Sequence, residues 1–586
     1  MEKEALQKAK EWVNNPYFAE KDRQEIQALI DKNDTKELVE RFYKDLEFGT
    51  GGIRGILAMG NNRMNRYNVR KATQALATVI KKTGAAAPKV AISYDSRHFS
   101  FDFAKETASV LAGNGIKAFI YKRMNPVCLL SFSVRYHKAI AGVMITASHN
   151  PPEYNGYKLY WDDGCQVTAP HDNNVIEAYY SLHDLNQISY MPFEEAEKKG
   201  MVNWVGEDVE NAYFEMVKSK TINPKLCQSR GPELSFVYTP LHGTGLIPVT
   251  TAFKNIGLTN FAVVEEQTKP DGNFPTVKSP NPENAEALDL AVRLMKDRKA
   301  DLAFGSDPDA DRIGVAVSHR GEVHYLSGNQ MGILMLHYIC SNLKEQGRMP
   351  KDPYFVKTIV TTTLQDKIAA SFGVKTENTL TGFKWICGRM REIENKEPNK
   401  TFLFGTEESF GYLTHDQVRD KDGVAPITML GEMALWYKTR NMTLIDALDS
   451  IYEQYGYHHE GLLNMNYYGK EGSEKILRIM DRLRKNPPTE FCGEKVVEID
   501  DIKTGKKKNM STNKLSDIAL PSSNVLGFIF ESGNRIFCRP SGTEPKIKFY
   551  TMVQDAKPGT LSDKKERAKK KTNAFIDFLK EICEKA

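Results

Sequence analysis

One short segment restricts the fold more than any other part of this 586-residue chain. The apolar run 139–145 suits a buried β-strand, and the sequence Thr-Ala-Ser-His-Asn-Pro-Pro follows it at 146–152. Consecutive prolines fix φ and lack backbone N–H groups, so the chain can continue there neither as a helix nor as a central strand. Ser148 is therefore expected at the carboxyl end of a strand, where ligands bind in open α/β sheets. A hydroxyl there is a candidate nucleophile, although a polar loop that only turns the chain is the structural alternative.

A second segment, 305–312, places carboxylates at every second residue between two strand-like runs. Asp307, Asp309 and Asp311 can converge on one hard cation, and carboxylates completed by water or phosphate oxygens suit Mg²⁺. A calcium-binding EF-hand loop begins similarly but needs Gly at its sixth position and Glu at its twelfth. Arg312 and Ser318 stand at those positions, so the sequence excludes an EF-hand.

A third segment covers 405–411 and continues into 419–423. Glu407 and Ser409, two residues apart, can accept hydrogen bonds from adjacent sugar hydroxyls. Arg419 and Lys421 can hold a phosphate or pass a proton. A charged surface turn is the structural alternative.

A fourth segment, 539–546, lies between two strand-like runs and has the groups that a phosphate cradle needs. Arg539 offers a planar fork, Ser541 and Thr543 offer hydroxyl donors, and Gly542 lets backbone N–H groups approach an anion. A simple hairpin loop is the alternative here.

Taken together, the four segments resemble the α-D-phosphohexomutase family, in particular its long phosphoglucomutase- and phosphopentomutase-like members. The resemblance extends from residues 48–55 to the Arg539 loop. It implies that Ser148 is a phosphoserine and that Asp307, Asp309 and Asp311 bind Mg²⁺ together with a phosphoserine oxygen. Arg312 would then neighbour the metal and the transferring phosphate.

The same resemblance implies roles for further residues. Arg54 and Lys158 would assist proton transfer at the reacting hydroxyl. Apart from the resemblance, the position of His149 next to the candidate nucleophile makes it a rival base, with orientation of the loop as the structural alternative. Glu407 and Ser409 would recognise the sugar hydroxyls. The remaining groups expected to contact the substrate are Lys421, the sugar-orientation loop with Gly382 and Lys384, and a phosphate clamp of Arg539, Ser541, Gly542 and Thr543.

Two more motifs follow strand-like runs. Asp95-Ser96-Arg97 is expected to organise the active-site loops without touching the reacting atoms. His242-Gly243-Thr244-Gly245 is common to the family, and we expect it to shape a turn.

The fold class implied by the resemblance is α/β, with three related α/β domains and a C-terminal α+β domain with an antiparallel sheet around a central cleft. The residue pattern agrees, because 101–112 has helical spacing after Ser100 as a candidate N-cap, whereas 525–553 is typical of consecutive antiparallel strands. The predicted domains are 1–210 with the phosphoserine loop, 211–325 with the metal loop, 326–455 with the sugar loop and 456–586 with the phosphate loop.

Composition agrees with an intracellular enzyme. The net charge is +5, from 80 basic and 75 acidic residues, which gives no nucleic-acid signature. The eight Cys residues include no CxxC pair, which is typical of reduced thiols rather than disulfides or a zinc site. No run of about 18 apolar residues occurs. We therefore expect a cytoplasmic monomer or homodimer that binds sugar phosphates and neither nucleic acid nor membrane.

The expected activity is interconversion of α-D-glucose 1-phosphate and D-glucose 6-phosphate through phosphoserine and glucose 1,6-bisphosphate, with Mg²⁺ as cofactor and the bisphosphate as activator. A phosphopentomutase or a phosphomannomutase of the same family is the nearest alternative. An aspartate-dependent phosphatase is more remote, because it leaves Ser148 unexplained. A sugar-phosphate sensor without catalysis would need none of the three aspartates.

Overall fold

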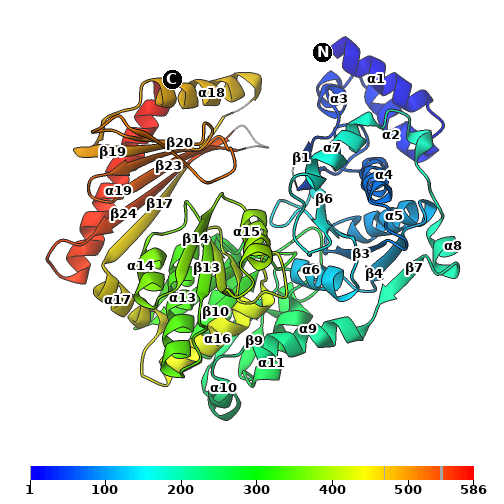
Figure 1. The fold of residues 1–586 in the computed structure, drawn as a ribbon. Helices are drawn as coiled ribbons and strands as arrows, with labels where there is room; N and C mark the ends of the chain where they lie inside the picture. Colours follow the sequence, from blue (N-terminus) through cyan, green and yellow to red (C-terminus); the bar gives the residue numbers. More distant parts are fainter. Residues whose placement is uncertain (1, 50, 468, 542–545, 586) are drawn as a thin grey trace. The chain divides into compact units, whose positions relative to one another are not determined.

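The computed structural model describes residues 2–49, 51–467, 469–541 and 546–585 (Figure 1). The described residues fall into two compact units, Met1–Leu326 with Phe410–Thr439, and Ser327–Ser409 with Arg440–Ala586. The chain therefore leaves the first unit and returns to it for a short segment. The predicted domain limits near 210, 325 and 455 and the central cleft stay predictions.

The first unit begins with three helices, α1 (Glu2–Asn14), α2 (Glu20–Asp31) and α3 (Thr35–Phe42). Trp12 stacks on Phe18 in their common core, with ring centroids 3.8 Å apart. The Asp22 carboxylate of α2 accepts hydrogen bonds from Tyr67 Oη at 2.6 Å and from Arg66 Nη2 at 2.7 Å. Both partners lie on α4 (Arg66–Lys82), so this pairing fastens the N-terminal helices to the next layer.

The first sheet has the strand order β1-β2-β6-β5-β3-β4-β7 among the described residues. Neighbouring strands from β5 to β7 are parallel, whereas β1, β2 and β6 pair antiparallel. The strand bounds are β1 (Phe48–Gly49), β2 (Gly52–Ile56), β3 (Lys89–Tyr94), β4 (Lys117–Tyr121), β5 (Ala141–Ile145), β6 (Tyr154–Trp161) and β7 (Val202–Val205).

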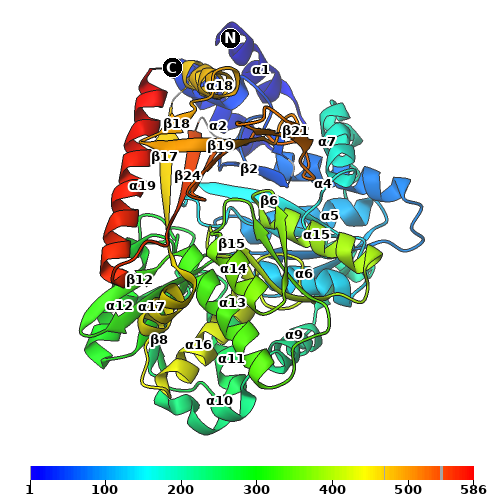
Figure 2. The same cartoon turned by 60° about the vertical axis from the view of Figure 1, so that its left-hand side comes forward.

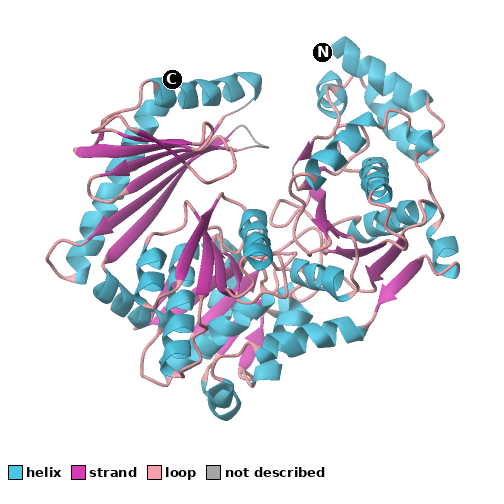
Figure 3. Cartoon of the chain, in the orientation of Figure 1, coloured by secondary structure: helices cyan, strands magenta, loops and turns pink. Residues whose placement is uncertain are grey.

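Helices cover both faces of this sheet (Figure 3). Val90 and Ile92 of β3 belong to the core cluster that also holds residues of α4 and α5, whereas Ala91 packs with Val127 and Leu130 of α6. Alternate residues of one buried strand thus point to opposite layers, which explains why residues 90–92 are all apolar. The helices that follow α4 are α5 (Ser100–Gly113), α6 (Val127–Tyr136), α7 (His171–Ser181), α8 (Phe193–Lys198) and α9 (Glu207–Ser219).

The second sheet of this unit has the described strand order β12-β11-β10-β8-β9. Strand β10 (Leu302–Ser306) pairs parallel to β8 (Phe236–Thr239) and antiparallel to β11 (Ile313–His319). The metal-loop aspartates therefore lie in the turn between two buried strands. The remaining elements are α10 (Pro224–Arg230), α11 (Leu246–Ile256), β9 (Phe261–Val263), α12 (Asp289–Arg298), β12 (Glu322–Leu326), β16 (Gly411–Leu413) and α16 (Val424–Lys438).

The second unit combines two kinds of sheet. Strands β14 (Lys375–Thr379) and β15 (Thr401–Glu407) flank β13 (Pro353–Thr358) in parallel. The antiparallel C-terminal sheet has the described order β17-β24-β23-β22-β19-β20-β21, with α19 along β17 and β24 (Figure 2). Further bounds are α13 (Gly328–Glu345), α14 (Leu364–Ser371), α15 (Phe383–Lys396), α17 (Leu444–Tyr455), β17 (Tyr457–Asn466), α18 (Gly469–Lys485), β18 (Glu490–Phe491), β19 (Glu494–Asp501), β20 (Lys506–Asn509), β21 (Leu515–Asp517), β22 (Leu526–Phe530), β23 (Arg535–Pro540), β24 (Lys546–Asp555) and α19 (Leu561–Glu584).

The predicted fold class is confirmed, with α/β layers along most of the chain and an antiparallel sheet at 525–553. One local prediction is wrong. The N-cap of α5 is Phe99 rather than Ser100, and Ser100 Oγ donates a hydrogen bond to Asp95 Oδ1 at 2.8 Å. The serine is drawn to a buried carboxylate, so it does not cap the helix. Among the described residues, no helix is both long and apolar enough to cross a membrane.

Glu460 in β17 makes the stability of the second unit depend on pH. Burial raises the pKa of its carboxyl group from 4.5 to about 7. The folded state thus favours the protonated form of Glu460. The contribution of this group to the free energy of unfolding is therefore complete below about pH 4.5 and is lost as the pH rises through 7.

We predict that Glu460→Gln removes this loss. The free energy of unfolding of the variant minus that of the wild type should increase by on the order of 2 kcal/mol from about pH 4.5 to pH 8. Urea denaturation at the two pH values measures this difference. The exposed Glu531→Gln is the matched control and should show no such growth. An equal difference at both pH values would contradict the prediction.

Candidate active site

Ser148 lies in the loop that follows β5, as the sequence predicts. Its backbone has a φ of 54°, a left-handed conformation that non-glycine residues adopt only at some cost. The side chain is buried, and its Oγ donates a hydrogen bond to Asp307 Oδ2 at 2.9 Å. His149 Nδ1 lies 3.1 Å from the same oxygen. The candidate nucleophile thus contacts both a carboxylate and an imidazole.

Asp307, Asp309 and Asp311 form a buried carboxylate cluster whose candidate ligand oxygens all lie within 4.8 Å of one another. Asp307 Oδ1 accepts hydrogen bonds at 3.0 Å from the backbone N–H groups of Asp311 and Arg312, which folds the loop tightly. Asp309 Oδ1 is buried and has no hydrogen-bond partner among the described residues. Such a set of oxygens fits a hard divalent cation.

Cationic side chains surround this carboxylate cluster. Lys158 Nζ lies 2.7 Å from Asp309 Oδ2 and 3.5 Å from Asp311 Oδ2. Lys421 Nζ lies 3.1 Å from Asp311 Oδ2, and Arg312 Nε lies 3.8 Å from Asp311 Oδ1. Arg312 also pairs with Glu283, which orients the guanidinium group. Cationic side chains therefore converge beside Ser148 and offset part of the negative charge of the cluster.

The pKa values reflect this crowding. Burial, then the charges of Asp309 and Asp311, raise the pKa of Asp307 well above its ordinary value. Burial also acts to raise the pKa of Asp311, but Lys421, Lys158 and Arg312 outweigh it and the net shift is downward. For Lys158, burial acts downward, and the two aspartates outweigh it, so the pKa is raised. Lys158 is thus protonated in this arrangement.

His149 differs from Lys158. Burial, followed by the Arg312 and Arg54 charges, holds the pKa of His149 well below its usual value. The neutral imidazole can accept a proton. Arg54 Nη1 donates a hydrogen bond to Asn150 Oδ1 at 2.9 Å, which places the guanidinium group beside the Ser148 loop.

The segment 415–423 is tied to the rest of the first unit by buried hydrogen bonds. Tyr160 Oη donates to Asp420 Oδ2 at 2.6 Å, and Tyr213 Oη donates to Asp422 at 2.9 Å. The N–H of Arg419 donates to Ser131 Oγ at 2.8 Å, and the Arg419 side chain is buried. These contacts hold Lys421 at the carboxylate cluster.

The predicted sugar-recognition residues lie in the second unit. Ser409 Oγ donates a hydrogen bond to the carboxylate of Glu407, at the end of β15. The neighbouring Glu408 accepts from Thr358 Oγ1 at 2.9 Å, and burial with the Glu407 charge raises its pKa to about 7. The carboxylate and hydroxyl predicted to act together are therefore adjacent.

The other two predicted substrate loops also belong to the second unit. Gly382 has a φ of 111° and precedes α15, whose first turn carries Lys384. Arg539 lies near the end of β23, and the N–H of Ser541 donates to Lys546 O at 2.7 Å. Gly542 and Thr543 lie outside the described residues.

The structure thus brings one set of predicted residues together in the first unit, namely Arg54, Ser148, His149, Lys158, Asp307, Asp309, Asp311, Arg312 and Lys421. Sequence reasoning gave no role to Glu283, the partner of Arg312, or to Thr146, whose Oγ1 accepts the Ser148 N–H at 2.8 Å. Glu283 stands 29 positions before its partner, and no local pattern links the two.

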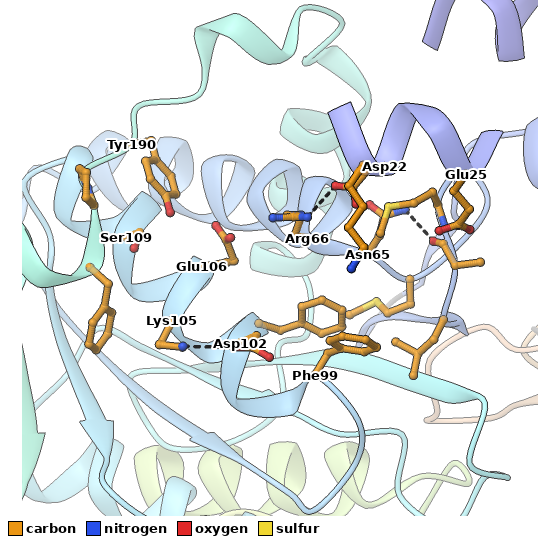
Figure 4. Close-up of a pocket in the computed structure, with 18 of the residues that line it drawn as sticks. Asp22, Glu25, Asn65, Arg66, Phe99, Asp102, Lys105, Glu106, Ser109 and Tyr190 are labelled. Atoms are coloured by element: carbon orange, nitrogen blue, oxygen red, sulfur yellow. Dashed lines mark hydrogen bonds and ion pairs between the residues drawn. The ribbon is translucent and has the colours of Figure 1, made fainter. Parts of the chain in front are cut away.

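A cavity of about 630 Å³ lies apart from these residues, between α2, α4 and α5 (Figure 4). Asp22, Arg66 and Phe99 are among its lining residues, and none of the predicted site residues is. The chemistry of the carboxylate cluster, not the size of a cavity, identifies the candidate site.

The chain is similar to known proteins over most of its length. Family models for phosphoglucomutase/phosphomannomutase alpha/beta/alpha domains I, II and III match residues 45–185, 211–321 and 327–455. A curated phosphoglucomutase of Staphylococcus epidermidis is 36% identical over 92% of this chain and 96% of its own length. A phosphoglucomutase of Staphylococcus aureus is 35% identical over 90% and 93%.

Solved structures show the same fold at lower identity. A crystal structure of a Thermus thermophilus protein described as a phosphomannomutase matches with a TM-score of 0.67 and 20% identity, over 92% of this chain and 99% of that one. Parafusin, a phosphoglucomutase from Paramecium, matches with a TM-score of 0.67 and 17% identity, over 92% and 96%. With family models over most of its length and relatives about one-third identical across nine-tenths of it, the chain belongs to the phosphoglucomutase/phosphomannomutase family of enzymes.

Proposed function

We propose that this enzyme interconverts α-D-glucose 1-phosphate and D-glucose 6-phosphate through a phosphorylated Ser148. The observation that carries the proposal is the Ser148 Oγ at 2.9 Å from Asp307, inside a cluster of carboxylates and cations. The curated relatives named phosphoglucomutase support glucose as the sugar.

The proposed reaction is two phosphoryl transfers. In the first, the P–O bond to Ser148 Oγ breaks while a bond forms to the free hydroxyl of the sugar monophosphate, whose proton passes to a base. The proposed acceptor of that proton is His149, which is neutral and lies beside Ser148 Oγ, and the proposed donor to Ser148 Oγ is protonated Lys158. The second transfer runs in reverse from the other phosphate of glucose 1,6-bisphosphate, so Ser148 is phosphorylated again.

The residues present fit Mg²⁺. Asp307, Asp309 and Asp311 would hold it, because their oxygens converge and Asp309 Oδ1 has no hydrogen-bond partner in the described part of the chain. A bound Mg²⁺ neutralises charge on the phosphoryl oxygens. Arg312 and Lys421 would stabilise the same oxygens from their places around the cluster. Free glucose 1,6-bisphosphate is the proposed activator, since it phosphorylates any Ser148 left unmodified when the intermediate escapes.

The sugar specificity is proposed to rest on Glu407 and Ser409, which can bind adjacent hydroxyls of a hexose. The proposed phosphate clamp comprises Arg539, Ser541, Gly542 and Thr543, with Gly382 and Lys384 on the sugar-orientation loop and Arg419 near the substrate phosphate. Asp307 already receives the Ser148 hydroxyl and two backbone N–H groups, which favours a mutase over a phosphatase that uses this aspartate as nucleophile. We further propose a cytoplasmic enzyme, monomeric or homodimeric, with sugar phosphates as its ligands.

Ser148→Ala should abolish interconversion, because no phosphoryl group can be stored on the enzyme, while glucose 1-phosphate still binds. A coupled assay of glucose 6-phosphate formation and calorimetric binding measure the two properties. Ser133→Ala, in buried α6, is the matched control and should keep its activity. Appreciable turnover by Ser148→Ala would exclude the phosphoserine route.

Asp307→Asn should leave the protein folded and remove the increase in Tm that Mg²⁺ gives the wild type, because the cation loses a charged ligand. Thermal unfolding with and without Mg²⁺ measures this. Asp301→Asn removes a partly exposed carboxylate of the same region that pairs with Lys438, and it should keep the full shift. A full Mg²⁺ shift in Asp307→Asn would place the metal elsewhere.

Glu407→Gln should lower kcat/KM for glucose 1-phosphate by about 10- to 100-fold, as expected for the loss of a charged hydrogen-bond acceptor. The Mg²⁺-dependent Tm shift should persist. Parallel kcat/KM values for glucose, mannose and ribose 1-phosphates, with a trace of glucose 1,6-bisphosphate, test the sugar assignment. The exposed Glu397→Gln serves as control. If ribose 1-phosphate is the best substrate of the wild type, the enzyme is a phosphopentomutase and the glucose proposal is wrong.

A further inference from the structure

The Ser148 loop needs an external support. Ser148 has a left-handed backbone, and Pro151 and Pro152 in the loop have no backbone N–H group to donate a hydrogen bond. Its carbonyl oxygens at 148, 150, 151 and 154 nevertheless converge on one side chain. That side chain is Arg97, whose guanidinium group is fully buried.

Each terminal nitrogen of Arg97 donates to two carbonyl groups. Nη1 lies 2.8 Å from Pro151 O and 3.0 Å from Tyr154 O. Nη2 lies 2.6 Å from Ser148 O and also donates to Asn150 O. The planar fork of arginine allows this fourfold contact, whereas the single ammonium of lysine cannot reach two separate pairs of acceptors.

Asp95 links Arg97 to the other side of Ser148. Asp95 Oδ1 accepts from the N–H of Arg97 at 3.0 Å and from Ser100 Oγ at 2.8 Å. Asp95 Oδ2 accepts from Thr146 Oγ1 at 2.6 Å, and this hydroxyl oxygen in turn accepts the Ser148 N–H at 2.8 Å. Both backbone polar groups of Ser148 are therefore fixed by one network, the carbonyl through Arg97 and the N–H through Thr146.

The loop at 269–276, which precedes α12, packs over the same arginine. The Phe274 ring centroid lies 5.0 Å from Arg97 Cζ. A Cβ on Gly272 would come within 2.7 Å of His98 N, so only glycine allows this close approach. His242, which the sequence placed in a turn, lies 3.0 Å from Lys269 O and 2.9 Å from Thr276 Oγ1 and so holds this loop.

We propose that Arg97 is a positioning residue that fixes the place of Ser148 Oγ for both phosphoryl transfers; this inference rests on the role proposed for Ser148. A phosphoryl group adds a charge of about −1.5 to −2, which would displace a mobile loop. Arg97 holds the backbone, so the oxygen accepts and donates the phosphoryl group at the same position beside Asp307. In this role Arg97 acts through the loop backbone, to which its side chain donates four hydrogen bonds.

The test is Arg97→Lys, compared with the wild type in the phosphorylated form. We expect kcat to fall by about 100-fold, as for a displacement of about 1 Å, with little change in KM. Phosphorylation of dephosphorylated Ser148 by glucose 1,6-bisphosphate, followed by intact mass, should slow similarly. Added guanidinium should raise the kcat of Arg97→Ala, and ammonium should not.

Arg63→Lys is the matched control. Arg63 is also buried and also donates to backbone carbonyls, those of Glu40 and Asn62. Neither of these acceptors belongs to the Ser148 loop. This variant should lose stability without losing kcat. If Arg97 variants fail to fold, Thr146→Val removes the hydroxyl that joins Ser148 N to Asp95 and should lower kcat selectively.

The outcomes separate the two proposals. If the wild type neither becomes phosphorylated on Ser148 nor interconverts the sugar phosphates, the proposed function is wrong. If the wild type does both and the Arg97 or Thr146 variants retain its kcat, or lose kcat only in proportion to unfolding as Arg63→Lys does, the positioning role is overturned. A selective loss of kcat with guanidinium rescue supports it.

Discussion

The candidate site depends on the balance of charge around Asp307, Asp309 and Asp311. Carboxylates this close and this deeply buried repel one another, and burial alone disfavours their ionised forms. Lys158 and Lys421 compensate part of this charge from β6 and from the segment before α16. The remaining oxygens favour a divalent cation and place a hydroxyl nucleophile in a strongly polar setting.

This balance explains why the chain returns to the first unit at 410–439. The return is secured by buried hydrogen bonds of Asp420 with Tyr160 and of Asp422 with Tyr213. Each carboxylate is satisfied there, so the segment that carries Lys421 is held by polar contacts as well as by the apolar helix α16.

Local pattern was sufficient for much of the fold, and the resemblance to the family indicated the type of chemistry. Alternating strands and helices, the antiparallel C-terminal sheet, and the loops with Ser148 and Asp307 followed from periodicity and turn residues. It failed at Ser100, where propensity favours an N-cap but a buried Asp95 competes for the hydroxyl. It also failed to pair Arg312 with Glu283, since an ion pair between loops leaves no periodic signal.

Neighbouring residues along the chain are enough to specify which chemical groups are present and where strands end, because dihedral limits and side-chain spacing are local properties. Tertiary structure decided which groups meet. Lys158 contacts Asp309 across 151 positions, and Arg97 gathers carbonyls more than 50 positions away. These contacts depend on sheet register and on the packing of separate loops, which no stretch of the chain encodes alone.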